Sequence, residues 1–133
     1  MHTVGSCDIT STIRPPAPHI PFSSIKKRVL GKKYELSIVL IGDTLARRLN
    51  REHRGKDYPA NVLSFPLSPS EGEIFINVRK AEREAFAFGM SKKARVALLF
   101  IHGMYHLAGY QHGSTMEKKE TAVLRAFGMS VMK

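Results

Sequence analysis

The sequence has a single cysteine, no long apolar run and few acidic residues relative to basic ones. Because Cys7 has no second cysteine to join, an internal disulfide is excluded and a reducing compartment is favoured. No apolar run approaches the ~20 residues that a membrane-spanning helix needs, and the first residues lack the pattern of a secretion signal. These absences favour a cytoplasmic protein without a membrane partner.

Basic residues outnumber acidic ones by 21 to 11, which gives a formal net charge of +10. They recur along the whole chain instead of forming a tail, as at Lys26–Arg28, Arg47–Arg48 and Lys118–Lys119. A positive field of this kind attracts polyanions and speeds their encounter with the protein. The charge therefore favours nucleic acid as a partner, with solubility alone as the alternative.

The length of 133 residues and the 43% hydrophobic content are typical of one domain. Residues 1–21 hold four prolines and are expected to be irregular or an edge element. Hydrophobic periodicity, glycines and caps predict strands at 34–41, 62–65 and 73–78 and helices at 22–31, 43–55, 79–89, 91–107 and 115–126. Pro66 is expected to end the second strand, and Asp43 to be the N-cap of the second helix. Such alternation predicts an α/β or α+β layered domain, with the apolar 91–107 helix buried at its centre.

Three histidines form the most informative cluster. His102 and His106 lie four residues apart on the predicted helix, so their imidazoles project from one face. Gly109 is predicted to end that helix and turn the chain back, which brings His112 toward the same point. Three imidazoles predict a zinc site with an open fourth position for water, although nickel, copper or cobalt also suit them. The alternative is two core histidines bonded to backbone and a surface His112.

The residue after the first histidine narrows the chemistry. Zinc peptidases carry a glutamate at this position, which serves as their general base. In this sequence the position is Gly103. The pattern therefore argues against a peptidase.

Two segments resemble the signature motifs of one family. Ile101–His112 resembles the sequence His-Gly-x-x-His-Leu-x-Gly-x-Asp-His of the YbeY family, bacterial endoribonucleases of ribosomal RNA maturation. Asn50–Asp57, followed by Asn61–Pro66, resembles the second conserved block of the family. Further similar residues are Glu71–Ile74, Met116, Glu120 and Leu124. The resemblance covers about residues 34–128, with the motifs in the family's order.

The resemblance implies a single compact α+β domain over residues 1–133, with a metal-dependent hydrolase core at 34–128. A small mixed sheet would pack against helices around a central buried helix that bears the histidines. His102, His106 and His112 would hold one zinc ion per chain. Arg54 would be the catalytic residue, because a guanidinium fork pairs with phosphate oxygens and offsets charge in the transition state.

The implied activity is single-strand-specific cleavage of ribosomal RNA precursors or ribosomal particles, in small-subunit rRNA maturation and ribosome quality control. Two positions depart from the family pattern, since Gln111 replaces an aspartate and Ala60 a threonine. An aspartate could orient an imidazole through a charged hydrogen bond, and glutamine carries no charge. A second hypothesis is therefore a non-catalytic ribosome-assembly RNA-binding factor with a structural metal. A third hypothesis is a metal-dependent hydrolase of a peptide or acyl amide. The net charge and the glycine at position 103 argue against it.

Overall fold

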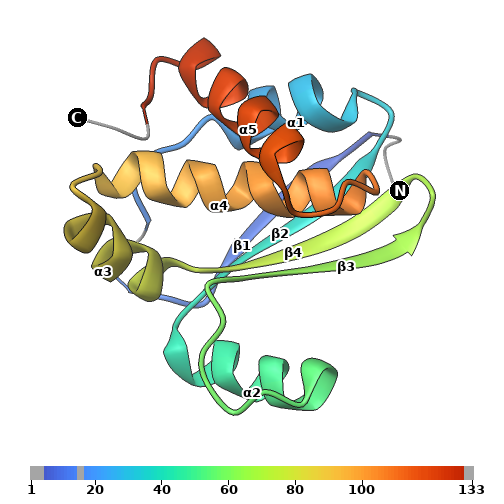
Figure 1. The fold of residues 1–133 in the computed structure, drawn as a ribbon. Coiled ribbons are helices and arrows are strands. Elements are labelled where there is room, and N and C mark those ends of the chain that lie inside the picture. Colours follow the sequence, from blue (N-terminus) through green and yellow to red (C-terminus); the bar gives the residue numbers. More distant parts are fainter. Residues whose placement is uncertain (1–4, 15–16, 131–133) are drawn as a thin grey trace.

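A mixed sheet forms the centre of the computed structural model, which describes residues 5–14 and 17–130 (Figure 1). Its four strands within these residues lie in the order β1 (Cys7–Ser11), β2 (Glu35–Ile41), β4 (Glu71–Asn77) and β3 (Val62–Ser68). β1 and β4 run parallel to β2, whereas β3 runs antiparallel to β4. The sheet therefore has β1 at one edge and β3 at the other.

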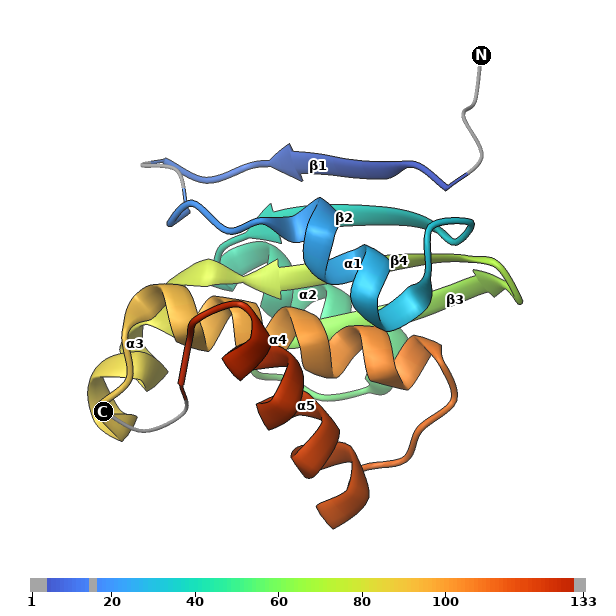
Figure 2. The same ribbon diagram turned by 90° about the horizontal axis from the view of Figure 1, so that it is seen from above.

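Five helices in the described residues cover the two faces of this sheet. α1 (Phe22–Leu30), α4 (Lys92–Leu107) and α5 (Ser114–Ala126) lie on one face, and α2 (Asp43–Arg54) lies on the other (Figure 1). Seen from above, α1 overlies β2 and α5 crosses α4 (Figure 2). α3 (Val78–Phe88) follows β4 directly and packs against α4. The arrangement is a single compact α+β domain.

α4 is the central helix, as its apolar sequence predicted. It contacts α1, α3, α5, β3 and β4. One core cluster joins large buried side chains from alternate positions of β2 and β4 to others from α4: Leu36, Ile38, Ile74, Ile76, Phe100, Ile101 and Met104. This core fixes the helix that carries His102 and His106 against the sheet.

Two local predictions were wrong. Pro66 was expected to end its strand, but β3 continues to Ser68 because an edge strand can accommodate a residue without an N–H donor. Asp43 was expected to cap α2, but Gly42 is the N-cap residue. The Asp43 carboxylate instead accepts hydrogen bonds from Asn77 of β4 and Arg83 of α3. The N-terminal edge element at Cys7–Ser11 is a strand, whereas residues 1–4, 15 and 16 of the expected irregular segment lie outside the described residues.

None of the helices in the described parts of the chain is long and apolar enough to cross a membrane.

α4 approaches the sheet closely at Gly103. A Cβ atom at this position would lie 2.8 Å from Ser64 Oγ and 3.3 Å from two carbons of Ile74. The Ser64 hydroxyl also donates a hydrogen bond of 3.0 Å to the Gly103 carbonyl oxygen. The position at which a peptidase would hold its general base is therefore a packing contact between α4 and β3.

Gly103→Ala should lower the free energy of unfolding by about 1–3 kcal/mol, because overpacking outweighs the gain in helix propensity of up to ~1 kcal/mol. Denaturant unfolding measures the change. In a Ser64→Ala background the same substitution should be less destabilising, since the hydroxyl that the new methyl group meets is gone. A Gly103→Ala variant as stable as the wild type would contradict the close contact.

Asp43 joins α2 to α3 through a pair of hydrogen bonds of 2.9 Å from Arg83. These bonds, together with that from Asn77, hold the pKa of Asp43 below its usual value. A depressed carboxylate pKa stabilises the fold above the pKa of the unfolded chain, and this stabilisation is lost as the pH falls through the folded value. The stability difference between wild type and Asp43→Asn should therefore shrink below about pH 4. Thermal unfolding across pH tests this, and a difference that stays constant would contradict it.

Candidate active site

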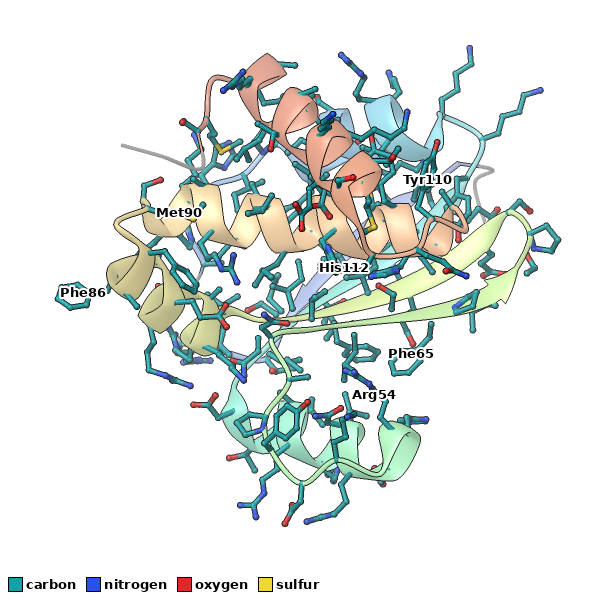
Figure 3. The ribbon with its side chains drawn as sticks, viewed as in Figure 1. Arg54, Phe65, Phe86, Met90, Tyr110 and His112 are labelled. Atoms are coloured by element: carbon teal, nitrogen blue, oxygen red, sulfur yellow. The ribbon has the colours of Figure 1, made fainter. Side chains whose placement is uncertain are left out.

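A cleft of about 470 Å³ runs along the free edge of β3, between α2 and α4. It is lined by Arg54 of α2, by residues 61–65 at the sheet edge, and by His102 and His106 of α4. Figure 3 shows Arg54 on the α2 side of this strand and His112 on the α4 side. The structure thus brings three of the four predicted site residues to one cleft, from segments about fifty residues apart in sequence.

The imidazoles of His102 and His106 face each other, with their Nε2 atoms 3.0 Å apart. Their Nδ1 atoms are held by other groups: that of His102 lies 2.6 Å from Glu120 Oε2, and that of His106 lies 3.2 Å from the Tyr110 carbonyl oxygen. A carbonyl or carboxylate oxygen only accepts hydrogen bonds, so both Nδ1 atoms are the donors. Both Nε2 atoms then carry bare lone pairs that point at one another.

Two facing lone pairs are stabilised only when positive charge lies between them, either a proton or a metal ion. Partial burial lowers the pKa of His106, and the nearby charge of His102 lowers it further. A lowered pKa favours the neutral imidazole, which is the form that binds metals. The two backing hydrogen bonds match the outer contacts that orient metal-bound histidines in proteins. The donor set therefore fits a metal ion.

His112 lies close to this pair but is turned away from it. Gly109 adopts a φ of 93° and reverses the chain, as the sequence predicted, so that the His112 ring lies 5.5 Å from that of His102. Its Nε2 atom, however, lies 3.8 Å from Glu117 Oε1, and its side chain is largely exposed. In the parts of the chain that the structure describes, no three His, Cys, Asp or Glu side chains form a group that could hold a metal ion. The three-histidine ligand set stays a prediction.

Arg54 ends α2 at the mouth of the cleft, where Gly55 caps the helix with a φ of 66°. The neighbouring ring of His53 packs on Phe65 at a centroid distance of 4.9 Å, which holds this end of α2 against β3. Arg47 and Arg51 form ion pairs with Asp57. Among the described residues Arg54 forms no ion pair, so its guanidinium is available to an anion in the cleft.

Several residues that support the site had no role in the sequence prediction. Glu120 of α5 is buried, and its carboxylate orients His102. Glu84 of α3 accepts hydrogen bonds from Asn61 at the cleft and from Arg95 of α4. The sequence resemblance included Glu120 but gave it no role. Its partner His102 lies 18 residues earlier, on another helix. Sequence spacing gives no signal for such a contact.

Comparison with known proteins identifies similar sequences over most of the chain. A family model described as Endoribonuclease YbeY matches residues 16–129. The Endoribonuclease YbeY of Helicobacter pylori strain Shi470 is 36% identical over 117 residues, which cover 81% of this chain and 84% of that protein. The Endoribonuclease YbeY of Wolinella succinogenes is 41% identical over 103 residues, which cover 71% and 73%.

A similar fold occurs in a solved structure. The solution structure of TM1509 from Thermotoga maritima matches with a TM-score of 0.65 at 22% identity, over 90% of this chain and 87% of that one. At this level of identity the match supports the α+β fold alone.

Glu120→Ala should release His102, because the Nδ1 hydrogen then has no acceptor. We expect a mixture of the two ring tautomers where the wild type holds one, and a loss of about 1–3 kcal/mol in stability. Histidine side-chain ¹⁵N NMR measures the tautomers, and denaturant unfolding measures the stability. Glu117→Ala is the matched control on the same helix, since Glu117 is exposed and lies near His112. Unchanged His102 resonances in Glu120→Ala would contradict the assigned contact.

Proposed function

Because the chain belongs to the YbeY family of metal-dependent endoribonucleases and is therefore a hydrolase of RNA, we propose a zinc-dependent enzyme that cleaves single-stranded ribosomal RNA precursors. His102, His106 and His112 hold the zinc ion, and Arg54 binds the scissile phosphate. The observation that carries this proposal is the pair of facing Nε2 atoms, 3.0 Å apart, in the cleft that also receives Arg54. The same proposal includes a role in small-subunit rRNA maturation and quality control, and a cytoplasmic location.

The histidines hold the ion through neutral imidazoles. Glu120 and the Tyr110 carbonyl keep the Nδ1 hydrogens of His102 and His106, which leaves both Nε2 atoms as donors. His112 is the third ligand that we propose, since its ring is near His102 and its largely exposed side chain can turn away from Glu117. Held by these three imidazoles, a zinc ion would supply Lewis-acid chemistry that polarises a phosphate oxygen or activates water.

Arg54 approaches the cleft from the opposite face of the sheet. Its guanidinium fork pairs bidentately with phosphate oxygens and keeps its charge at any working pH. Held at the end of α2, it positions the phosphodiester over the histidine pair and offsets the negative charge that develops in the transition state. The net charge of +10 supports a polyanionic substrate.

The departure at Gln111 had favoured a non-catalytic RNA-binding factor. Within the described residues Gln111 forms no hydrogen bond with the histidines, and Glu120 and Tyr110 already orient His102 and His106. With glutamine in place of aspartate at position 111, the imidazoles of His102 and His106 therefore keep the hydrogen bonds that orient them. This observation supports cleavage over binding alone.

The test is metal content and RNA cleavage measured on one preparation of each variant. Wild type should hold about one zinc per chain and cut single-stranded RNA. His106→Ala should lose both, because the two imidazoles that remain, His102 and His112, bind zinc weakly. Arg54→Ala should keep the metal but cut about 100-fold more slowly or worse, by analogy with the removal of other donors to a transition-state anion.

Arg48→Ala is the matched control, because Arg48 is an exposed arginine of the same helix that pairs with Glu52 and does not line the cleft. It should keep both the metal and the cleavage. If zinc is bound but neither the wild type nor Arg48→Ala cuts RNA above background, the metal serves another role and the RNA-binding hypothesis replaces the enzyme.

A further inference from the structure

An aromatic surface lies beside the histidine pair, at the end of α4, and the proposed cleavage does not use it. It consists of Tyr105, Tyr110 and Lys119, and we call it the tyrosine surface. The rings of the two tyrosines meet edge to face with centroids 5.2 Å apart, and the Lys119 Nζ atom lies 5.5 Å from the Tyr110 centroid. Tyr110 keeps 37% of its surface exposed to solvent. It is therefore an accessible ring with a cation beside it.

The backbone ties Tyr110 to the metal-binding pair. After α4 ends, the Gly109 N–H donates to the His106 carbonyl and the Tyr110 N–H donates to the Tyr105 carbonyl, both at 3.0 Å. This pair of bonds is the Schellman motif, which fixes the residue after the left-handed glycine. The Tyr110 carbonyl in turn accepts the bond from His106 Nδ1. The Tyr110 backbone is thus held next to His106, and its ring meets that of Tyr105.

The two helices α1 and α5, which pack against α4, carry unpaired cations. Among the described residues, Lys118, Lys119 and Arg28 form no ion pair with an acidic side chain. Burial raises the pKa of Tyr105, and the positive charge of Arg28 lowers it. Lys119 of α5 therefore lies beside a pair of aromatic rings, a combination that also occurs in the grooves that bind single-stranded nucleic acids.

We propose that Tyr110 is a stacking platform for the base of a nucleotide adjacent to the cleavage position, with Lys119 near a flanking phosphate. The proposal rests on the proposed function, since it concerns the RNA strand that enters the same cleft. A base can stack on a side chain only when it has left its duplex. Stacking on Tyr110 therefore favours single-stranded over double-stranded RNA without reading the base sequence.

The chain contains no tryptophan, so Tyr110→Trp introduces a single fluorescent reporter at the tyrosine surface. Titration with a single-stranded oligouridine should quench this fluorescence, because the base stacks on the indole. Phe86→Trp is the control reporter: Phe86 is 91% exposed on α3, at the opposite end of α4 from Tyr110 (Figure 3). Its fluorescence should stay unchanged over the same range of RNA concentration.

The affinity for oligouridine distinguishes a stacking role of the Tyr110 ring from a purely structural one. In the Arg54→Ala background, where the RNA stays largely intact, Tyr110→Ala should weaken oligouridine binding by about 5-fold or more. Tyr110→Phe should bind as tightly as the parent, since phenylalanine keeps the aromatic face. Both variants should hold as much zinc as the parent, and neither should change the affinity for duplex RNA.

Equal affinities of the Ala and Phe variants, or a Tyr110→Trp signal that RNA leaves unquenched, would overturn the stacking role. If the wild type still cut RNA in that case, the proposed function would stand without this surface. A wild type that neither binds nor cuts RNA would overturn both proposals.

Discussion

Helix α4 packs closely against the sheet edge at Gly103, which has no side chain to hold the two apart. At this point Ser64 and Ile74 occupy the space that a Cβ atom would need. His102 precedes the contact and His106 follows it by three residues, so the same approach sets both imidazoles beside β3. α2 reaches the opposite face of this strand through His53 and Phe65 and leaves Arg54 at the cleft. The histidines and the arginine thus take their relative positions from one edge strand.

The unprotonated Nε2 atoms of His102 and His106 face each other, although their lone pairs repel. Three segments of the chain hold the two rings in this arrangement. α4 carries the rings, α5 supplies the Glu120 carboxylate, and the turn after Gly109 supplies the Tyr110 carbonyl. Each acceptor fixes one tautomer, and both tautomers aim a lone pair at the same point. A cation bound at that point would relieve the repulsion and so would stabilise the folded arrangement of all three segments.

Local sequence signals predicted the part of this site that lies on α4 and on the turn at its end. The four-residue spacing placed His102 beside His106, and Gly109 indicated where the chain turns back. The family resemblance added Arg54, which no local pattern connects to the histidines. Glu120 could not be assigned its role, because its contact with His102 depends on how α5 crosses α4. Asp43 failed as a cap for a similar reason: tertiary partners in β4 and α3 compete for its carboxylate.

The position of the cleft along an edge strand also bears on how the protein avoids aggregation. An unpaired edge is a template for strands of other molecules, and a cleft open to a long RNA cannot be covered permanently by a helix. Pro66 lies within β3 near the turn into β4, where it has no N–H group to offer a foreign strand. Positive charge along α2 adds repulsion between copies of the chain. The edge can therefore stay open to a nucleic acid while it resists growth of the sheet from one molecule to the next.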